Sequence, residues 1–225
     1  MVFSRAFGTF ATRITINGAK LDRENTINHL GVTISEDLNW NQHVTQICKK
    51  AYPRVQMLTK LKYVGVATED LIELYCLHIR SITEYCSSAF HSTLSLQQSN
   101  TLEAIQKTCL KVILGVMYVD YNTALEMGGL ETLHMRRDHR SLQFAIKCIK
   151  HPINKNMFPA NPSADTHFIR NREIFKVNKT HSEYYKNSTI PYLQRRLNAH
   201  FQKLDELKKR RGVAARARGK SGVLD

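Results

Sequence analysis

The sequence predicts a mainly α-helical protein with a small N-terminal β-hairpin, an irregular region and a basic C-terminal tail. Three observations support this prediction: an alternating segment interrupted by Asn17-Gly18, apolar residues with helical spacing over 36–150, and lysine and arginine concentrated over 203–225. The chain has 225 residues, of which 42% are hydrophobic, so it can bury a core. We expect a hairpin in 1–35, a helical bundle in 36–150, an irregular region ending in a helix in 151–202, and a disordered tail beyond it.

Residues 12–34 predict the hairpin. Apolar and polar residues alternate with period two over 12–16, and both residues of Asn17-Gly18 tolerate the positive φ angles of a type I′ turn. Apolar positions resume at Ile27, Leu30, Val32 and Ile34. We therefore expect a single second strand, with Gly31 inside it allowing close backbone approach.

Helical spacing begins after this hairpin. Ser35 with Glu36-Asp37 predicts the cap of a first helix, whose apolar stripe runs from Trp40 to Leu61. Pro53 lies inside that stripe, so we expect a kink or a break near Tyr52. A second helix is predicted to begin at Thr68-Glu69-Asp70, with an apolar stripe at Leu71, Ile72, Tyr75, Cys76, Ile79 and Ile82.

The next helices have clear boundaries. Ser95 and Gln98 form a capping-box pattern before a helix with apolar residues at Leu102, Ile105, Cys109, Val112 and Ile113. Gly128-Gly129 predicts a break, and a fourth helix is expected from about Glu131 to Lys150. Residues 151–190 have weak periodicity, and helical spacing returns from Tyr192 to Leu207.

Cysteine usage and hydropathy limit the class of protein. The five cysteines are an odd number without a Cys-x-x-Cys pair, so neither a disulfide framework nor a zinc ribbon is expected. No run of about 18 apolar residues predicts a membrane span, and the N-terminus is a poor signal peptide. These features favour an intracellular protein, and they leave the choice between nucleus and cytoplasm open.

The net charge of +14 favours a polyanionic partner, chiefly nucleic acid. Candidate phosphate contacts lie on the polar side of the first helix, at Lys49, Lys50, Arg54, Lys60 and Lys62. A second basic patch is formed by Lys208, Lys209, Arg210 and Arg211. Arg136, Arg137, Arg140 and Lys147 on the fourth helix form a further basic set. For each group the alternative is a solvated helix face.

The sequence predicts no catalytic residue, no metal site and no cofactor. It contains neither a phosphate-cradling glycine loop nor a Gly-x-Ser-x-Gly elbow. Two-metal phosphoryl transfer needs converging carboxylates, and no Asp-Asp pair occurs. The acidic pairs Glu36-Asp37 and Glu69-Asp70 lie at helix starts, where they offset the helix dipole. His134, Asp138 and His139 are interpreted as a charged helix face rather than an iron site.

Four blocks together resemble one family. They are residues 27–44, which contain His-Leu-Gly-Val and Leu-Asn-Trp-Asn-Gln-His, then 79–87, which contain Glu-Tyr-Cys-Ser, then 104–115, and finally 188–198. In this order they resemble the C-terminal part of jockey-like non-LTR retrotransposon reverse transcriptases. The sequence departs from the family at His29, where tyrosine is usual, and at Phe90 or His91, where tryptophan is common.

This resemblance implies the last palm hairpin, a helical thumb and a connector, with the catalytic aspartates of the palm upstream of the chain. It implies that His29, Leu30 and Gly31 form a primer-grip-like turn, and that the helices contact a template–primer duplex. The expected partners are an RNA–DNA hybrid or a duplex, bound weakly, and a palm segment if one is encoded separately. No membrane partner is expected.

Residues 26–62 also resemble the N-terminal segment of an AlkB-type tRNA-modifying protein. That resemblance implies a 2-oxoglutarate dioxygenase and a methyltransferase. The chain has no His-x-Asp iron pair and no glycine-rich turn for S-adenosylmethionine, so neither activity is expected. A third alternative is an inert truncated product whose helices form only beside the missing palm.

Overall fold

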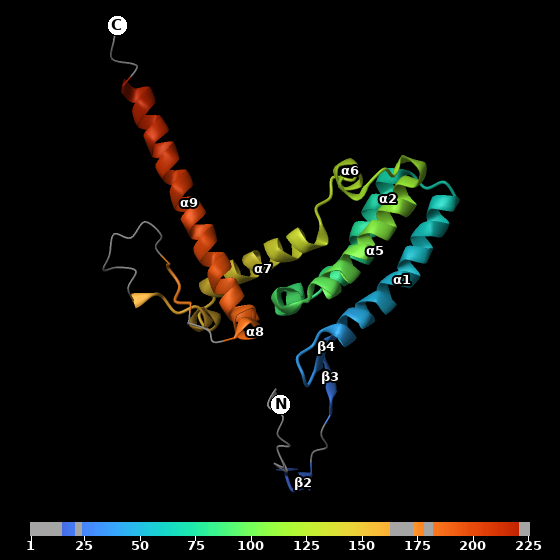
Figure 1. The fold of residues 1–225 in the computed structure, drawn as a ribbon, viewed down its shortest axis with the longest axis horizontal. Coiled ribbons are helices and arrows are strands. Elements are labelled where there is room, and N and C mark those ends of the chain that lie inside the picture. Colours follow the sequence, from blue (N-terminus) through green and yellow to red (C-terminus); the bar gives the residue numbers. More distant parts are fainter. Residues whose placement is uncertain (1–14, 21–23, 163–172, 178–181, 221–225) are drawn as a thin grey trace. The chain divides into compact units, whose positions relative to one another are not determined.

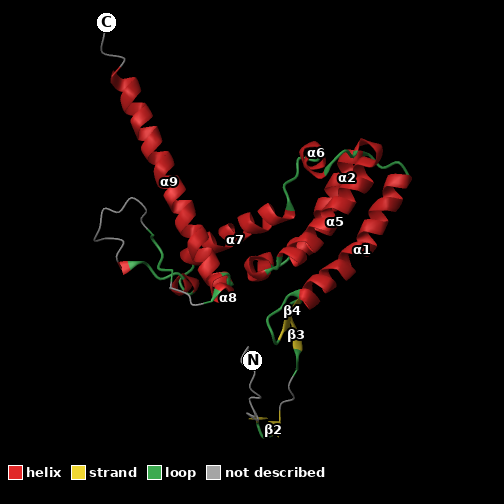
Figure 2. Cartoon of the chain, viewed as in Figure 1, coloured by secondary structure: helices red, strands yellow, loops and turns green. Residues whose placement is uncertain are grey.

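The computed structural model describes residues 15–20, 24–162, 173–177 and 182–220, and it confirms a mainly α-helical fold with a small N-terminal β structure (Figures 1 and 2). The chain divides into two compact units, which we describe separately. The first comprises residues 1–90 and 94–136, and the second comprises 91–93 and 137–225. The boundary therefore falls inside a helix, between Arg136 and Arg137, rather than after residue 150. No helix in the described ranges has the length and apolar character needed to cross a membrane.

Two short hairpins lead into the helices. Strands β1 (Thr15–Ile16) and β2 (Ala19–Lys20) pair antiparallel around Asn17-Gly18, whose φ angles of 50° and 79° confirm the predicted turn. The prediction of a single second strand after this turn is wrong, because that part of the chain forms a second, separate hairpin. Strands β3 (Thr26–His29) and β4 (Val32–Ser35) pair antiparallel around Leu30-Gly31.

Gly31 lies in this second turn and not inside a strand. Leu30 and Gly31 have φ angles of 49° and 81°, the left-handed region that a two-residue hairpin turn requires and that glycine adopts without strain. The Asn28 side-chain oxygen accepts a hydrogen bond from the Gly31 N–H at 3.0 Å. A short polar side chain just before the turn thus stabilises a reversal that alternating hydrophobicity did not indicate.

Helix α1 (Asn41–Tyr63) begins later than predicted and does not break at Pro53. Ser35 is not its cap. The Ser35 hydroxyl bonds within the loop, to Asp37 and to the backbone of Asn39. Pro53 is on the exposed side of the helix, where water can hydrate the Lys49 carbonyl that lacks a proline N–H partner.

The core of the first unit forms where α1, the stretch 68–84 and α5 (Leu96–Leu114) pack together. The middle stretch is helix α2 (Thr68–Leu74), a π-helical segment (Tyr75–Arg80) and helix α3 (Ser81–Glu84). The predicted stripes supply the core, with Val44, Ile47, Ala51, Val55, Leu58, Leu71, Tyr75, Ile79, Leu102, Ile105, Cys109 and Ile113 all buried.

One amide fixes how α1 and α5 align. The Gln98 side chain donates to the side-chain oxygens of Asn39 and Asn41 at 2.9 and 2.7 Å, so the N-terminal ends of the two helices meet. Because they also pack along their length, they run parallel, as Figure 1 shows. The capping box predicted for α5 is confirmed, with Ser95 and Gln98 each bonding the other's backbone N–H.

Buried polar groups tie the rest of the first unit to α5. Helix α4 (Ser87–Phe90) precedes α5 in the chain, and helix α6 (Tyr121–Met127) follows it. The break predicted at Gly128-Gly129 is confirmed, because α6 ends at Met127. Gln106 bonds the hydroxyls of Tyr75 and Tyr121. The Glu103 carboxylate accepts from Tyr121 and from two backbone N–H groups at the start of α7 (Leu133–Lys150), where an anion complements the helix dipole.

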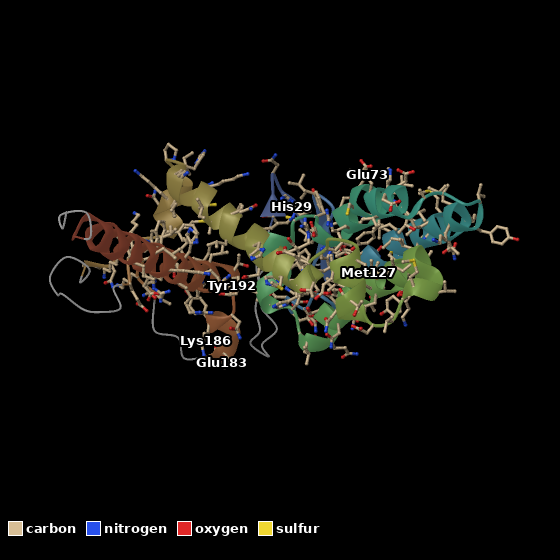
Figure 3. The ribbon with its side chains drawn as sticks, turned by 90° about the horizontal axis from the view of Figure 1, so that it is seen from above. His29, Glu73, Met127, Glu183, Lys186 and Tyr192 are labelled. Atoms are coloured by element: carbon tan, nitrogen blue, oxygen red, sulfur yellow. The ribbon has the colours of Figure 1, made fainter. Side chains whose placement is uncertain are left out.

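The second unit packs the C-terminal part of α7 against α9 (Thr189–Lys220) around Ala145, Cys148, Phe158, Leu193 and Leu197. Between them lie a 3-10 turn (Asn154–Met157), an isolated bridge from Ala160 to Phe175 and helix α8 (Glu183–Lys186). Figure 3 labels Glu183 and Lys186, whose side chains pair on the surface of α8 at 2.9 Å. Helix α9 extends to Lys220, so most of the tail is helical where the sequence predicted disorder.

Removing the capping box tests the alignment of α5. We expect Ser95→Ala to lower the free energy of unfolding by about 1 kcal/mol, because the Gln98 N–H loses its acceptor. The control is Thr101→Ala in the same helix, whose exposed hydroxyl bonds only the preceding turn and whose loss is expected to be near neutral. Chemical denaturation measures both, and equal stability of the two variants would contradict the assignment.

Candidate nucleic-acid interface

The β3–β4 turn is the first element of the candidate interface, and it is held from outside the hairpin. Leu30 is 78% exposed, and His29 beside it is exposed on β3 (Figure 3). The Tyr85 hydroxyl donates to the Leu30 carbonyl oxygen at 2.9 Å. A turn that would otherwise depend on two strands of four residues is therefore anchored to the end of α3. Tyr85 was not among the predicted site residues, although it belongs to the Glu-Tyr-Cys-Ser block.

A buried histidine joins the same hairpin to α1. The Thr33 backbone N–H donates to His43 Nδ1 at 3.3 Å, and the ring packs edge-on against Phe90 with centroids 4.9 Å apart. Burial, and to a smaller extent the nearby Lys50 charge, lowers the pKa of His43 below 6.5. Because Nδ1 accepts a hydrogen bond, the neutral imidazole is the form that fits this position.

The five predicted basic residues of α1 do not share one face. At about 100° per residue, Lys49 and Lys60 differ by only about 20° around the helix and lie about 16 Å apart along it. Both are exposed, opposite the buried Ala51 and Leu58. Lys50 is also exposed, on the side nearer His43. The structure thus brings two of the five residues onto the outward face.

Arg54 and Lys62 have other surroundings. Arg54 Nη1 donates to the His78 carbonyl oxygen at 2.6 Å, so its guanidinium connects α1 to the π-helical segment. Lys62 is half-buried in the last turn of α1, where a cation interacts favourably with the helix dipole. Helical spacing alone could not show the partner of Arg54, which is 24 residues away in sequence.

Helix α5 adds two basic residues that the sequence interpretation missed. Lys107 and Lys111 are exposed one turn apart, with their ammonium groups 4.9 Å from the Tyr121 ring and 5.5 Å from the Tyr118 ring. The i, i+4 spacing of two lysines on the polar face of the predicted helix was the available signal. Their positions above tyrosine rings depend on tertiary contacts with α6 and the loop before it.

Of the four basic residues predicted as a set on α7, two lie in buried or partly buried positions and two are exposed. Arg136 forms a two-point ion pair with the buried Glu84 at 2.5 and 3.2 Å, and Arg137 is 0% exposed. Arg140 and Lys147 are exposed. Arg136 is therefore structural, because the buried Glu84 carboxylate without its cation would strongly destabilise the fold. Arg137 is too buried to contact a phosphate.

The C-terminal basic run belongs to the second unit. Lys208, Lys209 and Arg210 are exposed on α9, and the Arg211 side chain lies outside the described residues. This run and the α1 lysines are therefore in different units, and each is a separate candidate surface.

Among the described residues, no group of three or more histidine, cysteine, aspartate or glutamate side chains is placed to hold a metal ion. Asp138, near His134 and His139 in sequence, accepts hydrogen bonds from the Tyr192 hydroxyl and the Arg196 guanidinium. Comparison of the chain with protein families, curated proteins and solved structures gave no match. The function proposed for it therefore depends on its own residues and geometry.

The attachment of the hairpin is expected to depend on pH through His43. Its pKa is lower in the folded state than in the unfolded chain, so the unfolded chain binds more protons as the pH falls below about 6.5. We expect the free energy of unfolding to decrease over that range. His43→Gln removes this contribution, whereas His29→Gln, on the exposed part of β3, leaves it in place. Urea denaturation between pH 8 and 5 measures the difference, and identical pH profiles for wild type and His43→Gln would contradict it.

Proposed function

We propose that this chain is a non-catalytic segment that binds nucleic acid, with α1 and the β3–β4 turn as its contact surface. One observation supports this proposal most strongly: α1 has no aspartate or glutamate over its 23 residues, and three of its five basic residues, Lys49, Lys50 and Lys60, are exposed lysines that form no ion pair within the described ranges. A solvated surface helix usually mixes charges of both signs. A helix with cations alone, in a chain with a net charge of +14, is suited to phosphates.

The proposed origin of the segment is the thumb region of a jockey-like non-LTR retrotransposon reverse transcriptase. The resemblance rests on sequence blocks, and three of the blocks contact one another in the fold. Tyr85, from the second block, holds the Leu30 carbonyl of the first block. Ile105, Cys109 and Ile113, from the third block, lie in the core that includes α1. This packing supports the proposal that the blocks form one functional unit.

The proposed contacts position nucleic acid rather than read its sequence. Lysine ammonium groups neutralise phosphates without distinguishing bases, and an exposed backbone turn such as Leu30-Gly31 contacts a strand by shape. We therefore expect weak, salt-dependent binding with little sequence preference, to an RNA–DNA hybrid or a duplex. A polymerase palm encoded separately would be a further proposed partner.

Salt dependence tests this proposal. We expect the chain to bind a fluorescein-labelled 20-base-pair hybrid at 50 mM salt, with log affinity falling by about 0.9 per phosphate neutralised as log salt rises. Lys49→Gln/Lys60→Gln is expected to reduce that slope by about 2, because two phosphate contacts are lost. Fluorescence anisotropy over a salt series gives the slopes.

The matched control is Lys155→Gln/Lys176→Gln, which removes the same charge from exposed positions in the second unit. Equal slopes for the two double variants would contradict a contact at α1. No binding at 50 mM salt would contradict the proposed function, and a broad, non-cooperative unfolding curve would favour an inert product.

A further inference from the structure

The outward face of α1 carries a row of exposed side chains. It includes tyrosines, which a purely electrostatic contact with phosphates does not explain. Exposed side chains recur at intervals of three or four residues, which places them on one face of a helix. We call this set the outer stripe; it consists of Thr45, Lys49, Tyr52, Gln56, Lys60 and Tyr63. Tyr63 is 93% exposed and Tyr52 is 48% exposed, although tyrosine rings are more often half-buried.

The stripe contains one short motif twice. Lys49 to Tyr52 and Lys60 to Tyr63 both read Lys-x-x-Tyr, and equivalent positions are 11 residues apart. Eleven residues are almost three complete turns, so the second copy is rotated by only about 20° and displaced by about 16 Å. Each copy therefore presents one ammonium group and one aromatic ring, one turn apart, in the same direction.

The chemistry of the stripe distinguishes between partners. It contains no acidic and no aliphatic side chain, and lysine is depleted at the centres of protein–protein interfaces. An exposed tyrosine ring beside a lysine offers a stacking surface for a base and a contact for its phosphate. In a duplex the base faces are already covered by their neighbours, whereas an unpaired strand exposes them.

We infer that the outer stripe of α1 binds single-stranded nucleic acid, with each Lys-x-x-Tyr copy holding one stacked base and one phosphate. This inference rests on the proposed function and adds to its duplex or hybrid ligand a second one, an unpaired strand. A stacked strand advances about 3.4 Å per nucleotide, so the two copies are separated by about five nucleotides. Oligonucleotides shorter than about five nucleotides engage one copy, and longer ones engage both.

The test compares one double variant on two ligands. Tyr52→Leu/Tyr63→Leu keeps every charge and removes both rings from exposed positions, so the fold is expected to persist. We expect its affinity for fluorescein-labelled dT12 to fall at least about tenfold, and its affinity for a blunt 12-base-pair duplex to stay within about twofold. Tyr185→Leu, at an exposed tyrosine of α8, is the control and is expected to bind both ligands as wild type does. Circular dichroism checks the helical content of each variant.

A length series provides the second readout. Wild-type affinity for dT3, dT6 and dT12 is expected to rise most between dT3 and dT6, and this rise is expected to disappear in Tyr52→Leu/Tyr63→Leu. An equal loss on dT12 and duplex, or no loss on either, overturns the inference while leaving salt-dependent binding, and so the proposed function, intact. No binding of wild type to any of the oligonucleotides at 50 mM salt overturns both.

Discussion

The packing of α1 against α5 determines most of what the first unit can do. Each helix buries a stripe of aliphatic residues, and Gln98 aligns their N-terminal ends by bonding Asn39 and Asn41. Dense packing of one face leaves little freedom to rotate the helix about its axis, so the opposite face is fixed toward solvent. The lysines and tyrosines of that face do not contribute to the core. Their exposure is therefore a consequence of a core made by other residues.

The same packing also places the hairpin. His43, on the buried side of α1, accepts from β4, and Tyr85, at the end of α3, holds the β3–β4 turn. Two strands of four residues are too small to be stable alone, so these two contacts give the turn a defined position. The turn and the outward face of α1 thus belong to one unit, whose core fixes both.

Local features of the fold were predictable from sequence, and tertiary ones were not. The prediction of a capping box at Ser95 is confirmed, because the motif depends on two residues only three positions apart. The predicted apolar stripes are confirmed because buried residues recur with the period of the helix. The turn at Gly31 was missed because the strand pattern continues through it. Arg54 and Arg136 were grouped with surface cations, but their partners are 24 and 52 residues away in sequence. Charge patterns therefore identified the basic helix, and only tertiary contacts could separate its exposed lysines from its structural arginine.

Nuclear magnetic resonance offers the most direct measurement of whether α1 is the nucleic-acid contact. Chain labelled with ¹⁵N and with ¹³C in its tyrosine rings would be titrated with unlabelled dT12 at about 50 mM salt. We expect the largest shift changes in the amides around Lys49 and Lys60 and in the rings of Tyr52 and Tyr63. Shift changes confined to the basic run at Lys208–Arg210, or spread evenly over the surface of both units, would contradict a contact at α1.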